Sequence, residues 1–414
     1  MRPDVRLLRG ISWQVAMAHS PYNPKSELFK AYPEMQTLSK EANDVMEGAE
    51  ETLSEREFAG CDTSWARAHL YEAEWRIGCT SDCKAARDAV ERLKKALVCT
   101  DPPDGLTQDC GGSFAPGTDV FFLKLDRSTD QLLARQWPWR LQPTFLDPIN
   151  DPGRMVTYLQ DLCWSDVVRC GRDNRKELNL AVSVVARLVL QGGQAGYLSG
   201  PGFVPVFERF VRDWQDPATG FFGVTYIIDS QGNEIRTTDL SLTFHMVRYA
   251  PHLVRWWPRL IDTLFAIKDQ QYPQGWLENS KMSDHNNYDV VELFFRGWPY
   301  MRADQRRQAS QEVAKMFKWC LNGSVRDTGE IINPDKGDMV MDSYYFAAAF
   351  LDTIGYFGTS KRFWADKGQL PADTEPLRKA MIAQLKRFNS DLTVVDDTLE
   401  RLGAGPRPWS NAIL

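Results

Sequence analysis

Histidine and paired cysteines, the usual ligands of metal sites, are what this sequence has little of. The 414 residues include only 5 His, and the 8 Cys form no CxxC pair. No Cys and His residues have the spacing of zinc ligands, so the sequence predicts no metal site. The glycine-rich stretch at 192–202 lacks the Gly-Lys-Ser/Thr of a phosphate-binding loop, and we interpret it as a linker. We therefore expect no cofactor.

A surplus of positive charge is also missing. The chain has 49 Lys and Arg against 55 Asp and Glu, a formal net charge of -6. Because phosphate binding needs a basic surface, this balance argues against a nucleic-acid partner. No apolar stretch approaches the roughly 20 residues that cross a bilayer, so no membrane-spanning helix is expected.

The first 20 residues combine a basic start with a short apolar middle. Trp13 and Gln14 interrupt that middle, so an N-terminal amphipathic helix is favoured over a signal peptide, which stays the alternative. In a chain of this length, the cysteines that cluster between Cys61 and Cys110 favour free thiols over a disulfide framework. These features favour a reducing, cytoplasmic location.

Apolar residues make up 43% of the chain and recur mostly at helical spacing. The pattern predicts an all-α fold, with helices over 35–57, 62–78, 82–98, 153–170, 173–191, 237–250, 254–269, 285–300, 303–320, 340–357 and 372–388. Two regions differ. Residues 220–238 form two β-prone runs around a polar turn and predict a small β-hairpin. Residues 100–150 are rich in Pro and Gly and predict an irregular excursion.

A repeat organises the second half of the chain. Glycine turns at 219–221, 274–276 and 328–330 recur about every 55 residues, the period of a helical-hairpin array. Each turn is followed by a polar loop, an acid, an apolar helix and then a more amphipathic helix. Inner and outer helices in such pairs predict one α/α toroid of about six hairpins over residues 1–414, with an open solenoid as the alternative.

These turns and polar helix starts resemble the repeats of the α/α-toroid superfamily. That group includes squalene cyclases, protein prenyltransferase β-subunits, and α/α-barrel polysaccharide lyases and glycoside hydrolases. The resemblance covers about residues 200–360, with weaker echoes at 62–65 and 151–154. It implies an architecture and a small-molecule or oligosaccharide substrate, but no single family, since one fold hosts many functions. The oligomeric state is left open.

The densest polar segment, Ser283–Asp289, leads directly into an apolar helix. Helix capping accounts for one or two polar residues, but not for His285, Asn286, Asn287 and Tyr288 together. We therefore predict a functional site at this helix start.

This segment is similar to the Asn-Asn-His-x-Tyr motif of alginate-lyase-like toroids, although its own order is His-Asn-Asn-Tyr. Such a lyase removes the proton α to a uronate carboxylate and expels the 4-linked oxygen. The resemblance implies that Asn287 neutralises the carboxylate, that His285 is the base and that Tyr288 is the proton donor.

A second constellation consists of acids. Asp239, Asp289 and Asp342 each lie near the start of consecutive inner helices. In a closed ring they would face one mouth, where two carboxyl groups roughly 6.5–9.5 Å apart suit an inverting glycosidase. The alternative for each Asp is a helix cap.

Six further residues are candidates for substrate binding: Asn286, Trp276, Arg236, His245, Tyr344 and Tyr345. Each also has a structural interpretation, because a lone His on an apolar helix or an aromatic beside a turn is usually part of the core.

Two further hypotheses stay open beside a lyase or hydrolase. An isoprenoid-processing toroid would need either a DxDD acid motif or an Asp/Cys/His zinc set. The stretch 394–398 is only faintly like the first, and no Cys lies in the polar loops where the second would be. A non-catalytic toroid that only binds a partner would leave the polar helix starts as caps.

Overall fold

The structure is a computed structural model of the whole chain. It describes residues 22–99, 111–113, 118–133, 143–191, 197–229, 231–332, 339–365, 370, 373–388 and 393–404. The predicted N-terminal segment lies outside these residues. The chain, predicted as one domain, separates into two compact units, unit 1 (1–49 and 65–266) and unit 2 (50–64 and 267–414).

Both units are mainly helical, which confirms the all-α prediction; the toroid itself stays a prediction. Unit 1 holds α2 (Pro24–Ala31), most of α3 (Pro33–Phe58), α4 (Ser64–Cys79), α5 (Cys83–Val98), α6 (Phe121–Leu133), η2 (Thr144–Ile149), α7 (Pro152–Leu162), β1 (Trp164–Ser165), α8 (Arg175–Gln191), α9 (Phe203–Trp214), β2 (Thr225–Ile227), β3 (Glu234–Arg236), α10 (Leu240–Tyr249), η3 (Pro251–Leu253) and α11 (Trp257–Ala266). Unit 2 holds α12 (Asp284–Gly297), η4 (Trp298–Tyr300), α13 (Ala303–Trp319), η5 (Cys320–Ser324), α14 (Val340–Thr353), η6 (Thr359–Lys361), α15 (Glu375–Leu385) and α16 (Thr393–Arg401).

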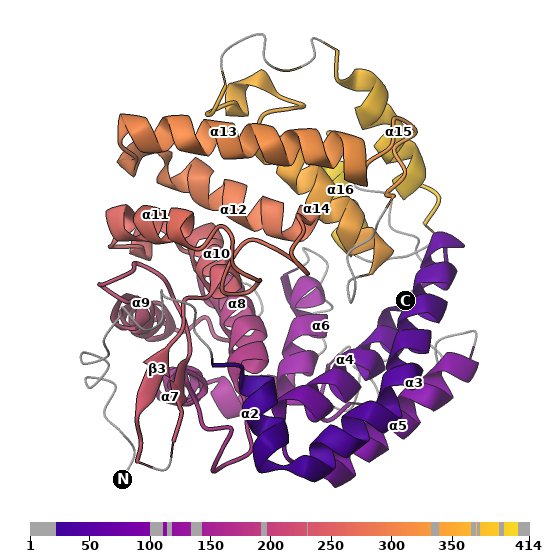
Figure 1. The fold of residues 1–414 in the computed structure, drawn as a ribbon, viewed down its shortest axis with the longest axis vertical. Coiled ribbons are helices and arrows are strands. Elements are labelled where there is room, and N and C mark those ends of the chain that lie inside the picture. The colour runs from indigo at the N-terminus through magenta and orange to yellow at the C-terminus, as the bar shows by residue number, and fades with distance from the viewer. Residues whose placement is uncertain are drawn as a thin grey trace. The chain divides into compact units, whose positions relative to one another are not determined.

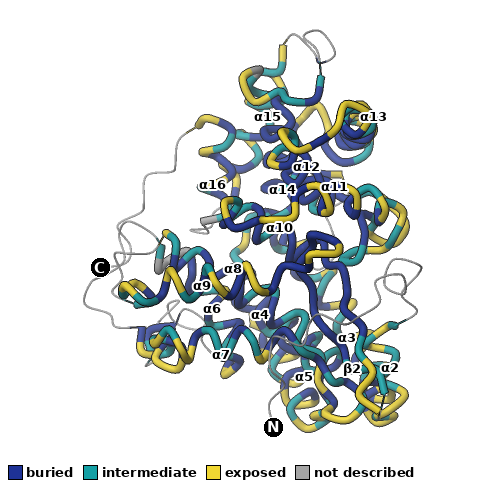
Figure 2. The backbone as a smooth tube through the Cα atoms, turned by 90° about the vertical axis from the view of Figure 1, so that its left-hand side faces the viewer, coloured by how far each residue is buried: buried dark blue, intermediate teal, exposed yellow. Residues whose placement is uncertain are grey.

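Alternate helices pack together in each unit. In unit 1, α8 packs against both α6 and α10, and in unit 2, α14 packs against both α12 and α16. Figure 1 shows α13 lying alongside α12. The inner helices α12 and α14 are buried along nearly their whole length, whereas α13 keeps an exposed face (Figure 2). This is the alternation of apolar inner and amphipathic outer helices that the repeat predicts.

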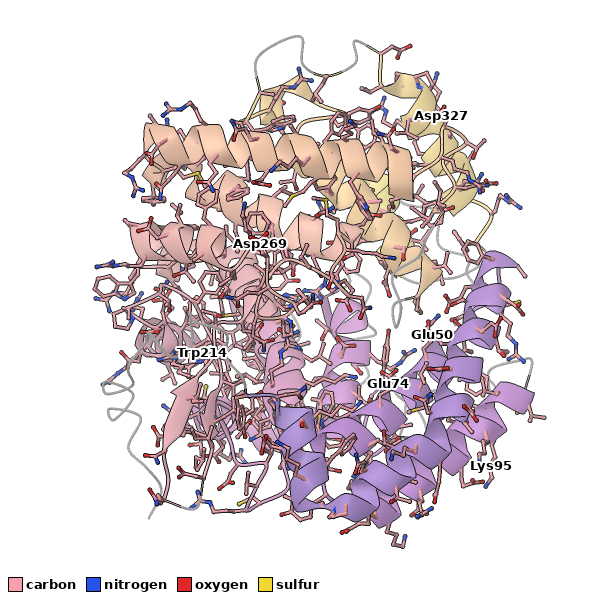
Figure 3. The ribbon with its side chains drawn as sticks, in the orientation of Figure 1. Glu50, Glu74, Lys95, Trp214, Asp269 and Asp327 are labelled. Carbon is pink, nitrogen blue, oxygen red and sulfur yellow. The ribbon has the colours of Figure 1, made fainter. Side chains whose placement is uncertain are left out.

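The predicted hairpin is present as β2 and β3, which are antiparallel, with Tyr226 opposite Ile235. β1, which no sequence pattern predicts, adds a parallel neighbour to β2. Trp214, labelled in Figure 3, is buried beside this sheet. Its indole Nε1 donates to the carbonyl oxygen of Gly223 at 2.9 Å, and its ring stacks on Phe210. The hairpin is therefore anchored to the end of α9.

Several boundaries differ from the sequence prediction. The helix expected over 153–170 ends at Leu162, because the chain turns there into β1 and pairs with β2. Part of the region expected to be irregular is helical, since α6 buries an apolar face within 100–150. Helices α2, α9 and α16 were also missed. α2 has only 8 residues and one buried apolar side chain, Leu28, whereas the apolar residues of α9 recur at helical spacing, so its sequence carries a signal.

Two of the repeated glycine turns lie in close backbone contact with the outer helix of the same repeat, α11 or α15. Gly220 and Gly329 have positive φ angles of 74° and 78°. A Cβ on Gly220 would lie 2.5 Å from the backbone nitrogen of Leu260 in α11, and one on Gly329 would lie 2.4 Å from the backbone carbon of Ala380 in α15. Only glycine fits such a turn, so the repeat has a steric cause.

An equivalent hydrogen bond is present in each of these two repeats. Thr263 of α11 donates its hydroxyl to the carbonyl oxygen of Thr219 at 3.0 Å. Gln384 of α15 donates its amide to the carbonyl oxygen of Thr328 at 3.2 Å. In both cases an outer-helix side chain bonds the residue before the glycine, which supports the equivalence of the two turns.

No helix in the described parts of the chain is both long and apolar enough to cross a membrane.

We expect Gly220→Ala and Gly329→Ala each to lower the free energy of unfolding by at least about 2 kcal/mol, from left-handed strain plus backbone collision. Gly48→Ala is the matched control, because Gly48 lies inside α3 with no atom near its added methyl group. It should stabilise the protein by about 0.5–1 kcal/mol. Urea unfolding measures all three, and equal stability of the three variants would contradict the steric account.

Candidate functional site

The start of α12 is fixed to the preceding glycine turn. Ser283 caps the helix, and its hydroxyl accepts a hydrogen bond from the backbone N–H of Asn286 at 3.2 Å. The amide of Asn286 donates to the carbonyl oxygen of Trp276 at 3.1 Å. Trp276 is itself buried, with its ring edge-on to Phe294. Asn286 and Trp276, both predicted to bind substrate, thus hold the turn and the helix together.

A second face of α12 carries a buried polar group beside η5, a π-helical turn. Asp284 accepts a hydrogen bond from the hydroxyl of Ser324. Burial, and then the charge of Asp284, raise the pKa of the Cys320 thiol well above its usual value. Asn287 lies one turn on from Asp284, is 2% exposed, and its Nδ2 finds no acceptor among the described residues.

Asn287 is therefore not on the same side of the helix as His285. Two residues along an α-helix correspond to a rotation of roughly 200°. Asn287 is buried on the side of Asp284, whereas the His285 side chain is 28% exposed. The structure does not bring together the carboxylate partner and the base that the lyase resemblance implies.

The third face of α12 combines His285 and Asp289, one helical turn apart. The His285 Nε2 lies 4.0 Å from Oδ2 of the fully buried Asp289. The Tyr272 hydroxyl donates to the same carboxylate oxygen at 3.3 Å. The imidazole stacks flat on Phe346 of α14, with ring centroids 4.1 Å apart. A buried carboxylate that faces a partly exposed imidazole is an arrangement used for proton transfer.

Tyr288 extends this face toward α14 and α16. Its ring lies edge-on to Tyr345, with centroids 6.1 Å apart. The Arg401 guanidinium of α16 lies 5.8 Å from the Tyr288 ring centre and donates to the Tyr345 hydroxyl at 3.4 Å. Arg401 is also 3.9 Å from Asp352, which Lys361 contacts more closely at 2.7 Å. We name the set Tyr272, His285, Tyr288, Asp289, Tyr345, Phe346 and Arg401 the α12 cluster.

Two of the predicted catalytic acids are helix caps. Asp239 caps α10 and accepts from the backbone N–H of Leu242 at 2.9 Å. It is also fully buried and forms an ion pair with Arg175 in unit 1, 2.7 Å from its Nε. Asp342 accepts from the backbone N–H of Met339 at the start of α14, at 3.2 Å. The structural alternative is thus the observed arrangement for both acids, and Asp289 differs from them because it lies in the second turn of its helix.

The remaining candidates are in packed surroundings. Arg236 of β3 is buried, and its guanidinium donates to the carbonyl oxygen of Trp214. Burial lowers its pKa from the usual value. His245 of α10 stacks on Tyr249. Tyr344 of α14 is buried edge-on to Phe388, and burial raises its pKa. Arg236 and His245 belong to unit 1, whereas the α12 cluster belongs to unit 2.

Three members of the α12 cluster were missed from the sequence. Tyr272 precedes the glycine turn, Phe346 follows the two tyrosines of α14, and Arg401 lies in what reads as a charged tail. The apolar residues 394, 395, 399 and 402 recur at helical spacing, so that tail carries a signal for α16.

Comparisons with protein-family models, curated proteins and solved structures gave no match. The described residues also hold no group of three or more His, Cys, Asp or Glu that could bind a metal ion. The resemblance to α/α toroids thus rests on the residues quoted for it, and the site must be judged by its geometry.

The buried ion pair predicts a structural role for Asp239. Asp239→Asn keeps a capping oxygen but removes the buried negative charge that pairs with Arg175, so it should lower the free energy of unfolding by roughly 3 kcal/mol. The control is Asp213→Asn, because Asp213 forms an exposed pair with Arg209 on α9 and should cost about 0.5 kcal/mol or less. Urea unfolding compares them, and equal midpoints would show that Asp239 has no such role.

Proposed function

We propose that the α12 cluster catalyses β-elimination on an acidic oligosaccharide, with His285 as the base. The observation that carries this proposal is the pairing of a partly exposed imidazole with a fully buried carboxylate, Asp289. Burying a carboxylate costs several kcal/mol unless it is paired. No helix cap needs Asp289, because Ser283 already caps α12.

Asp289 sets the tautomer of the imidazole in this proposal. A carboxylate facing Nε2 favours a proton on that nitrogen, so the lone pair of His285 is on Nδ1. Tyr272 holds the carboxylate from a second direction, and Phe346 supports the face of the imidazole. The 4.0 Å separation is longer than a hydrogen bond, as catalytic contacts often are without substrate.

Arg401 replaces Asn287 as the partner of the substrate carboxylate. A guanidinium binds a carboxylate through two parallel hydrogen bonds. The Arg401 guanidinium lies over the rings of both Tyr288 and Tyr345. Asn287 is buried on another side of α12. Tyr288 keeps the role of proton donor in this proposal; its ring is 1% exposed and packs beside Phe346 and Arg401.

The reaction has a simple balance. His285 takes the proton at the carbon next to the carboxylate, and the electron pair of that C–H bond forms the new carbon–carbon double bond. The bond from the neighbouring carbon to the 4-linked oxygen breaks, and Tyr288 protonates the leaving oxygen. Arg401 stabilises the charge that develops on the carboxylate. The products are a shortened oligosaccharide and an unsaturated uronate.

The paired-acid glycosidase has less support. Asp239 and Asp342 are already used as caps. Nothing in the α12 cluster favours isoprenoid chemistry.

The rate of β-elimination is measured on a panel of uronate oligosaccharides, from the ultraviolet absorbance of the unsaturated product. His285→Gln and Tyr288→Phe should each lower kcat by roughly 10²- to 10⁴-fold, the usual contribution of a general base or acid. Arg401→Lys should raise KM and lower kcat, because an ammonium loses the two-point contact.

His252→Gln is the matched control. His252 is exposed on η3 and paired loosely with Glu208 at 3.6 Å, so its replacement should leave kcat unchanged. Circular dichroism checks that each variant is folded. The absence of product across the whole panel, or full activity of His285→Gln, would overturn the proposal and leave a binding function as the alternative.

A further inference from the structure

A carboxylate at the end of α14 faces two cations in unit 2. Asp352 lies in the last turn of α14, where the negative end of the helix dipole destabilises an anion unless a cation pairs with it. Both of its oxygens accept from the Lys361 ammonium of η6, at 2.9 and 2.7 Å. The Arg401 guanidinium of α16 lies 3.9 Å from Oδ2, the oxygen that Lys361 contacts more closely. One carboxylate is thus shared unequally between two cations.

The three side chains differ in their exposure to solvent. The Asp352 side chain is only 11% exposed, whereas those of Lys361 and Arg401 are 52% and 26% exposed. The carboxylate is therefore held inside the group, and both cations are accessible to an anion that approaches from solvent.

The other contacts of Arg401 are with the α12 cluster. Its guanidinium donates to the Tyr345 hydroxyl at 3.4 Å and lies over the rings of Tyr288 and Tyr345. Its 3.9 Å separation from Asp352 is too long for a hydrogen bond. A guanidinium and a carboxylate normally form a two-point pair, so its absence here needs a reason. Lys361, which bonds both carboxylate oxygens, supplies one.

We propose that Lys361 is a positioning residue that keeps Arg401 available to the substrate carboxylate. By occupying both oxygens of Asp352, it prevents a two-point pair that would draw the guanidinium away from Tyr288 and Tyr345. Asp352 is then a competitor of the substrate for Arg401, and Lys361 suppresses the competition. The inference rests on the proposed function for what Arg401 binds, but not for the ion pairs themselves.

The first test is kinetic. Lys361→Gln should raise KM for uronate oligosaccharides roughly two- to fivefold, the size of a partly exposed ion pair. Arg401 must then leave Asp352 before substrate binds, so only a fraction of the chains is competent to bind. The rate after binding is unaltered, so kcat should stay the same. Lys361→Arg keeps a cation beside Asp352 and should have the KM of the unmodified chain.

A double variant separates this pairing from a simple loss of positive charge. In Asp352→Asn the competing carboxylate is absent, so the addition of Lys361→Gln should leave KM unchanged. If Lys361 acted only through its own attraction for the substrate, Lys361→Gln would raise KM by the same factor in both backgrounds. That result would overturn the inference.

Lys315→Gln is the matched control. On α13, Lys315 contacts both oxygens of Glu312 at 3.0 and 3.1 Å, and Lys268 lies 3.6 Å from Glu312 as the second cation. The side chains of Lys315 and Glu312 are 59% and 11% exposed, close to the values for Lys361 and Asp352. This group lies outside the α12 cluster, so KM should not change.

A substrate-free measurement tests the ion pairs apart from the reaction. Urea unfolding of Asp352→Asn, Arg401→Gln and the double variant gives the coupling between Asp352 and Arg401. This coupling should be larger in chains that carry Lys361→Gln than in chains that keep the lysine. Equal coupling in both backgrounds would overturn the inference, whatever the reaction. A larger coupling without product from any uronate would support the pairing and contradict the proposed reaction alone.

Discussion

A helix that is buried on nearly every face cannot leave the polar groups of its first turn to solvent. This constraint governs the inner helices of both units, most clearly α10 and α12. Each must satisfy its first backbone N–H groups with a side chain, and Asp239 and Ser283 do so. The polar residues that open the repeated helices are therefore, first of all, a requirement of burial.

The glycine turns follow from the same burial. Gly220 and Gly329 allow the turn to approach the backbone of the outer helix more closely than any Cβ would permit. An outer-helix side chain then bonds the carbonyl before each glycine. Because the outer helix is held to the turn, the inner helix begins at a defined position, and its side chains are placed reproducibly.

The α12 cluster stands apart because this constraint does not require it. His285 and Asp289 are one turn apart on a face that the cap leaves untouched, and the Asp289 carboxylate is buried at a cost in free energy. Aromatic rings from α14 and the loop before α12 support both groups. The fold does not need His285 and Asp289 as caps, which is a reason to assign this polar pair a chemical role.

The sequence predicted the helical class, the hairpin and the repeat, because each depends on local periodicity or a turn. It could not separate caps from reactive groups, since Asp239, Asp289 and Asp342 all precede or open apolar helices. Only the geometry shows that Asp289 lies a turn deeper than the other two. It also could not place Asn287 and His285 on different sides of α12 before the start of that helix was known. Arg401 and Phe346 come from helices distant in sequence, so no local pattern links them to His285.

The most direct measurement is exchange of the proton next to the substrate carboxylate, followed by NMR in deuterated water. In Tyr288→Phe the base is intact and the proton donor is lost, so the account predicts exchange without formation of the unsaturated product. In His285→Gln it predicts that exchange falls to the uncatalysed rate. Exchange in His285→Gln as fast as in the unmodified chain would contradict the assignment of His285 as the base.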